Sequence, residues 1–322
     1  MTREILAGAE QAFGLCLAVL PTMLAGCLAG SAFANSRFGL KCGALFMPLA
    51  RLASLGRLRE PIALYLALCF LSFHSANAYL ASLLHRGIVQ RRMILGIYLV
   101  GWLPASMHFY IFYTAPVLFP GFGVMTAGIV ISLYVLASVL IFLSGVVLTR
   151  MTARRYPESA ATTTPGLPGE PLRPGWKTVL RTGLLQFRSI AGVFVPCIFA
   201  VQILLSLSSA RALMDGVGDM LLLFGLPPAG ALVTVTALPS VMGGFATAIA
   251  CLNDGLLMPS QIPKVLMIAA IGHAFFSAFS YFLPANAAVF GPRFGTRITF
   301  SSLVVRVPSL VVALAVACCV VM

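Results

Sequence analysis

Two stretches of this chain, SFHSANAYLASLLHRG at residues 72–87 and SVMGGFATAIACLNDG at residues 240–255, align without a gap. Ser72 pairs with Ser240 at their starts. Each stretch is the second half of a strongly apolar segment, yet each carries small and polar residues where a lipid-spanning helix is normally apolar. Transporters with duplicated halves build their substrate site from matching interrupted helices, so this pair predicts a duplicated membrane protein.

The composition of the chain is that of an integral membrane protein. Of its 322 residues, 60% are hydrophobic and 9% are charged, and the mean hydropathy is +1.01. Soluble domains carry about 25% charged residues. The formal net charge is +13, but the Lys and Arg residues lie mainly between apolar segments. Cationic loops beside anionic lipid explain this charge better than binding to a nucleic acid polymer does.

The apolar segments fall into two halves. Residues 1–149 form the first predicted membrane repeat, residues 150–182 a linker, and residues 183–322 the second repeat. The linker is rich in proline and carries several arginines, which predicts a cytoplasmic segment without a core of its own. The fold class predicted is all-α integral membrane, with about ten transmembrane or partly re-entrant helices in two five-element repeats. The apolar segments are 6–34, 38–55, 61–85, 93–115 and 122–149, then 183–210, 212–226, 228–252, 262–285 and 298–321.

Loop charges favour an inverted relation between the two repeats. The positive-inside rule places the connections at 86–92 and 293–297 in the cytoplasm. Five crossings in each half make the second repeat enter the membrane in the opposite sense, whereas four would leave the repeats parallel. One stretch contradicts this topology, because Arg51 and Arg59 would lie outside.

Further matches extend the repeat beyond the opening pair. Gly101 corresponds to Gly272 in the later part of each half. The segments 38–55 and 212–226 hold equivalent places, and both are short for a full membrane span. Whether these two segments cross, lie at the interface or re-enter stays open.

Four stretches resemble the nucleoside-recognition, or Gate, family of bacterial and archaeal membrane proteins. The opening AEQAFGLCLAVLPTMLAGCLAGSAF (9–33) is similar to the family's first helix, and KCGALFMPLARL (41–52) to its short second helix. The pieces FLSFHSANAYL (70–80) and LPSVMGGFATAIA (238–250) resemble its interrupted regions. The family includes spore-maturation membrane proteins and relatives of the cores of concentrative nucleoside transporters. The resemblance therefore implies a permease-like core without identifying a nucleoside as the substrate.

Polar and small residues in the two matching stretches are the candidate substrate-binding residues. A polar group facing lipid costs several kcal/mol unless it is paired or hydrated, so these residues should face protein or water. The alternative for both stretches is helix packing, in which Ser, His, Asn and Gly residues join neighbouring helices. The candidates are Ser72, His74, Ser75, Asn77, Ser240, Gly243, Gly244 and Thr247.

Ionisable residues in or beside the apolar segments are candidates for coupling or gating. An ionisable group inside a membrane is a functional suspect, and histidine can relay protons near neutral pH. For the histidines, interhelical hydrogen bonding is the alternative, and for the aspartates it is solvation at a segment end. Arg306 must pair, reach the interface or face a cavity. The candidates are His108, Asp215, Asp219, Asp254, His273 and Arg306.

The function predicted is that of a multi-pass permease in the cytoplasmic membrane of a bacterium or archaeon. It would move a small polar, nucleoside-like solute or an ion by alternating access, between segments 61–85 and 228–252. The alternative is a non-transporting scaffold or assembly factor of the spore-maturation type. No catalytic motif such as HExxH, GxSxG or a P-loop occurs, so no enzyme is expected. We expect no metal or cofactor beyond a coupling Na⁺ or H⁺. The expected partners are the lipid bilayer and the solute, with homo-oligomers left open.

Overall fold

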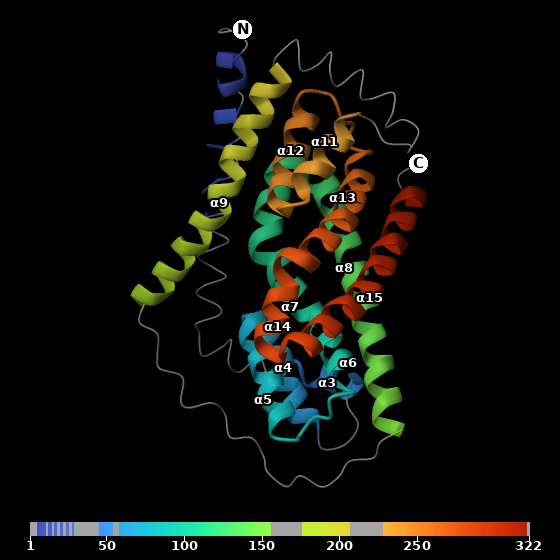
Figure 1. Ribbon diagram of the computed structural model, residues 1–322. Helices are drawn as coiled ribbons and strands as arrows, with labels where there is room; N and C mark the ends of the chain where they lie inside the picture. The colour runs from blue at the N-terminus through green and yellow to red at the C-terminus, as the bar shows by residue number, and fades with distance from the viewer. Residues whose placement is uncertain are drawn as a thin grey trace.

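Every regular element in the described part of the chain is a helix (Figure 1). Within this described part, three helices are long and apolar enough to cross a membrane, Ile94–Ala153, Ile262–Phe290 and Pro292–Val320. This agrees with the predicted all-α membrane protein. The computed structural model describes residues 45–53, 58–155, 176–206 and 228–320 and part of residues 5–28, apart from a few side chains.

The helices follow the same order in the two halves of the chain. From Arg59 in the first half and from Pro228 in the second, this order is two short helices, then a long arm interrupted by a π-helix, a bend at a glycine, and a second long arm. The first half contains α3 (Met47–Ala53), α4 (Arg59–Leu71), α5 (Phe73–His85), α6 (Ile94–Val100), α7 (Trp102–Phe109), η2 (Tyr110–Thr114) and α8 (Ala115–Arg155). The second contains α9 (Trp176–Ser206), α11 (Pro228–Ala237), α12 (Val241–Asn253), α13 (Ile262–Ser277), η3 (Ala278–Phe282), α14 (Leu283–Phe290) and α15 (Pro292–Val320).

The first interrupted segment doubles back on itself. Ser72 has an extended backbone, with φ −160° and ψ 110°, between α4 and α5. The Tyr65 hydroxyl donates a hydrogen bond of 3.4 Å to Asn77 Oδ1 across this break. Twelve residues of a straight helix span about 18 Å, which is too far for this bond. Helices α4 and α5 are therefore a hairpin with its tip at Ser72.

The second interrupted segment forms a matching hairpin from α11 and α12. Ser240 has φ −154° and ψ 122°, and its side chain accepts from the Gly243 amide as the N-cap of α12. The Thr236 hydroxyl donates to Thr247 Oγ1 over 2.8 Å across the tip. The prediction of interruptions in 61–85 and 228–252 is confirmed in position, but the chain reverses at each one instead of continuing in the same direction.

Landmarks in the two halves repeat at one constant offset. Gly87 and Gly255 have φ values of 70° and 69°, and Gly123 and Gly291 have 75° and 84°. Both pairs are 168 residues apart (255 − 87 and 291 − 123), as are the π-helices η2 and η3. Gly87 and Gly255 follow α5 and α12 in the left-handed conformation that glycine adopts readily at helix ends. The predicted match of Gly101 with Gly272 is wrong by three residues in this register.

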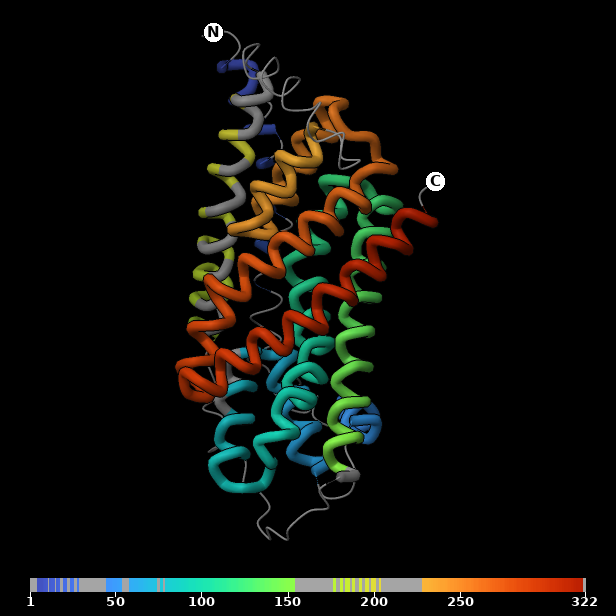
Figure 2. The backbone as a smooth tube through the Cα atoms, turned by 45° about the vertical axis from the view of Figure 1, so that its right-hand side comes forward, coloured from blue at the N-terminus to red at the C-terminus, as the bar shows by residue number. Residues whose placement is uncertain are grey.

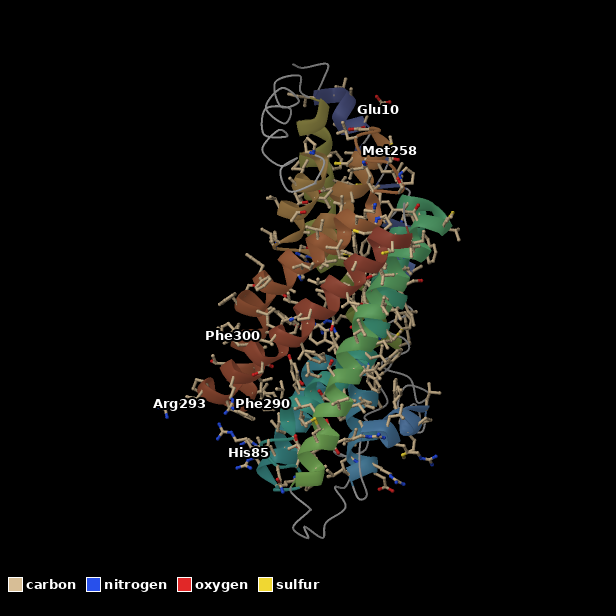
Figure 3. All side chains as sticks on the ribbon, turned by 90° about the vertical axis from the view of Figure 1, so that its right-hand side faces the viewer. Glu10, His85, Met258, Phe290, Arg293 and Phe300 are labelled. Atoms are coloured by element: carbon tan, nitrogen blue, oxygen red, sulfur yellow. The ribbon has the colours of Figure 1, made fainter. Side chains whose placement is uncertain are left out.

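The long arms of the two halves run in opposite directions (Figure 2). The bend within α8 lies at the upper end of the molecule, and the bend between α14 and α15 lies at the lower end. His85 and Arg293 lie at the lower end, which we call the basic end, and Met258 lies at the opposite end (Figure 3). A hairpin brings the start of α4 back beside the end of α5, so Arg59 belongs to the basic end as well. For Arg59, this reversal removes the conflict with the predicted topology that a straight 61–85 helix produced.

Candidate functional site

A buried arginine lies where the arms of the two halves pack together. The Arg306 side chain on α15 is 6% exposed. Its guanidinium carbon lies 4.2 Å from the centre of the Trp102 ring and 4.7 Å from that of Phe282. Such contacts stabilise a cation by about 2 kcal/mol or more when water is excluded. Among the described residues, the titratable groups that interact with this guanidinium are tyrosines and a histidine, and no carboxylate is among them.

The tip of the α4–α5 hairpin contacts this aromatic cluster directly. Phe73 is the first residue of α5. Its ring centre lies 5.9 Å from that of Trp102 and 6.3 Å from that of Phe282, edge to face in both cases. The rings that cover Arg306 are therefore also the rings against which the first hairpin tip packs.

The tip of the second hairpin approaches the same region from the other side. His273 on α13 places Nδ1 3.0 Å from the Ala237 carbonyl oxygen and 2.9 Å from that of Leu238, where α11 ends. These bonds satisfy backbone acceptors that a helix end leaves open. Arg306 is close enough to His273 for the two side chains to interact electrostatically. The rings beside the guanidinium thus contact the first hairpin tip, and the histidine near it bonds to the end of α11 at the second.

Buried polar side chains extend the cluster from α6 to α14 and α15. Asn286 donates to the Tyr98 hydroxyl over 3.3 Å and to Thr299 Oγ1 over 2.9 Å. The Tyr110 hydroxyl lies 3.0 Å from Ser138 Oγ. All of these side chains but Tyr110 are buried. Tyr98 and Tyr110 both interact electrostatically with the Arg306 charge.

The predicted residues of the first hairpin divide into three kinds. Ser72 is exposed at the tip. Asn77 is 5% exposed and accepts from Tyr65 within its own hairpin. His74 and Ser75 belong to α5, but their side chains lie outside the described part of the structure.

The predicted residues of the second hairpin cap and pack its two helices. Ser240 is the N-cap of α12, and Thr247 is fully buried and bonds to the Gly243 carbonyl oxygen over 3.0 Å. A Cβ atom added to Gly244 would come 2.5 Å from the Ala237 Cβ. Gly244 therefore permits the close approach of α11 and α12, as the packing alternative predicts.

The remaining candidates lie apart from the cluster or outside the described residues. His108 on α7 is held among aromatic rings, 4.9 Å from Phe112 between centres, and its buried Nδ1 has no hydrogen-bond partner within the described part. Asp254 is the C-cap of α12 beside the exposed turn at Met258. Asp215 and Asp219 fall in residues that the structure does not describe.

Comparisons with protein-family models, curated proteins and solved structures found no match for this chain. Function is therefore inferred from the geometry of the site.

The sequence predicted Arg306 and His273 but missed the residues between them. Trp102, Phe282 and Phe73 are single aromatic residues in apolar segments, where packing into a core is the ordinary interpretation. The sequence could have indicated a role for Asn286, because an amide side chain beside an apolar segment must form hydrogen bonds.

Proposed function

We propose that this chain is a multi-pass permease that moves a small polar solute across a bacterial or archaeal cytoplasmic membrane. The observation that carries the proposal is a buried arginine whose neighbouring rings pack against the first hairpin tip and which lies near the histidine bonded to the second. A charge inside the membrane is costly, and such residues commonly serve solute or ion pathways. The resemblance to the Gate family agrees with this proposal.

The proposed architecture is a pair of inverted repeats. The constant offset of 168 residues and the opposite directions of the long arms support it. In transporters of this kind, the solute site lies near the membrane midplane at the interface of the repeats. Arg306 contacts Trp102 of the first half and Phe282 of the second, which supports placing the proposed solute site beside it.

The charge at this position favours a solute with a carboxylate, a phosphate or another group rich in hydrogen-bond acceptors. Helices α5 and α12 both begin at the hairpin tips, and helix N-termini carry partial positive charge. The Trp102 and Phe282 ring centres lie 5.4 Å apart, so both rings cover one side of the guanidinium. A guanidinium offers five N–H donors, and its edge is the surface for an acceptor. A coupling H⁺ or Na⁺ stays part of the proposal, with His273 as the candidate proton carrier.

Accessibility of the two tips tests the proposal. The chain has eight cysteines, so Ser72→Cys and Ser240→Cys are placed in a cysteine-free background. A membrane-impermeant thiosulfonate reagent is then applied to right-side-out and inside-out vesicles. A permease that works by alternating access exposes both tips to water, so both variants should react. Val304→Cys on α15 is the control, since this 72% exposed apolar position should face lipid and stay unreactive.

A membrane scaffold is the second candidate function. Asn77 and Thr247 both form hydrogen bonds inside their own hairpins, which is the arrangement expected of residues that only join helices. If both tip cysteines resist the reagent from either side while the protein is folded, the permease is wrong and the scaffold is supported. Reaction of both tips would instead exclude a dry interior.

A further inference from the structure

A cationic hollow opens at the basic end, between the turn after α5 and the first turns of α15. Its volume is about 490 Å³. Among the residues that the structure describes, no acidic residue lines it, and its polar lining consists of three arginines and one serine. The lining residues are Arg91, Arg92, Leu95, Phe294, Arg297, Ile298 and Ser301.

The arginines are presented in a form suited to a phosphate group. The guanidinium carbon of Arg91 lies 4.3 Å above the Phe294 ring, which holds this side chain in one orientation. Arg297 and Ser301 are one turn apart on α15, so their side chains lie on the same face. Guanidinium groups bind phosphate oxygens through paired hydrogen bonds, and a hydroxyl adds one more donor. All three arginines are exposed, so their charges are accessible from outside the fold.

The other side of the hollow is apolar. This apolar wall consists of Leu95, Phe294 and Ile298, and Ile298 is only 1% exposed. Arg297 is the sixth residue of α15, one of the three helices able to cross a membrane. The hollow therefore lies near the level where a crossing helix leaves the lipid, and it joins a cationic rim to an apolar wall.

We propose that this hollow binds the phosphate headgroup of an anionic phospholipid, with the start of an acyl chain against the apolar wall. Basic pockets between membrane helices on the cytoplasmic side bind anionic headgroups in this way. A free phosphate ion would use the arginines but leave the apolar wall without a role. The assignment does not depend on transport, because it requires only that the helices cross a membrane.

Native mass spectrometry of the purified full chain in detergent tests the assignment, with phosphatidylglycerol, phosphatidylcholine and inorganic phosphate as separate probes. The wild-type chain should retain phosphatidylglycerol in preference to phosphatidylcholine. The double variant Arg91→Gln, Arg297→Gln should bind phosphatidylglycerol about 25-fold more weakly, from roughly fivefold for each of two basic residues near an anionic headgroup. Both arginines are exposed, so the variant should fold.

The matched control is the double variant Arg51→Gln, Arg59→Gln, which removes two exposed arginines elsewhere in the first half. It should bind phosphatidylglycerol as the wild type does. Equal binding of both lipids by the wild type would overturn the proposal. An equal loss in both double variants would overturn it too, because it would indicate diffuse surface charge. Competition by inorganic phosphate at the lipid's own concentration would assign the hollow to the free ion.

Discussion

Trp102 reports directly on the charge of Arg306. The chain has two tryptophans, and Trp176 on α9 is 71% exposed. Replacing it in Trp176→Phe therefore leaves Trp102 as the single indole with little effect on packing. In this background, quenching of Trp102 fluorescence by iodide, caesium and neutral acrylamide measures how each species reaches the ring. We expect iodide to quench much more strongly than caesium, and Arg306→Gln to remove this preference.

The size of the preference follows from the distance between ring and charge. The guanidinium carbon lies 4.2 Å from the centre of the Trp102 ring. An iodide ion touching the indole would lie roughly 7 Å from the charge, where opposite unit charges attract by about 2.4 kcal/mol at an effective dielectric constant of about 20. Salt and water in the site would lower this energy to roughly half. About 1.2 kcal/mol raises the local iodide concentration roughly eightfold, and the same charge repels caesium.

Two controls separate charge from damage to the fold. Arg306→Lys keeps the charge and should keep the preference for iodide, while acrylamide should quench every folded variant to the same extent. Equal quenching by iodide and caesium before Arg306 is changed would refute an anion-attracting site. If Asp215→Asn or Asp219→Asn then created the preference, one of these aspartates neutralises Arg306 in the native protein, and the proposed anion site would be wrong.

Three smaller predictions follow from packing and backbone geometry, each measured by thermal unfolding in detergent. Gly145→Ala should lower the free energy of unfolding by about 1–3 kcal/mol, because the added Cβ would lie 2.7 Å from a backbone nitrogen of α6. The control is Gly128→Ala, whose added Cβ meets no atom within 4 Å and which should be neutral or stabilising. Asn286→Leu should cost about 1–3 kcal/mol by leaving two buried hydroxyls without their donor. Gly123→Ala and Gly291→Ala should each cost about 1–2 kcal/mol, because both positions have positive φ; a much smaller cost at either bend would contradict its role as the sharp turn.

Local patterns in the sequence predicted the helices and the places where they break. The apolar segments correspond to helices wherever the structure describes them, because burying backbone groups in lipid requires helical hydrogen bonding. The alignment of Ser72 with Ser240 located two breaks whose backbone angles agree within about 12°. Such features depend on a few neighbouring residues and so are visible in one sequence.

The direction of the chain after each break depends on contacts that no local pattern contains. A serine in the extended conformation permits either a kink or a reversal. The bond from Tyr65 to Asn77 shows the reversal, but it joins residues on two different helices. The surroundings of Arg306 were hidden for the same reason, because Trp102 and Phe282 come from opposite halves of the chain. A single sequence gives each aromatic residue the same interpretation as any other core residue.

The reversal at Ser72 also bears on the relation between the repeats. Helix α3 has 7 residues, or about 10 Å, and is too short to cross a bilayer core of about 30 Å. If 61–85 crossed as one helix, the first half would cross four times, counting the predicted segment at 6–34 and the two arms joined at Gly123. Four crossings give parallel repeats and place Arg59 and Arg86 on opposite sides. The hairpin adds no crossing, which leaves three. An odd number agrees with the proposed inverted relation and places both arginines on the same side of the membrane, so the hairpin and the proposed inverted repeat support each other.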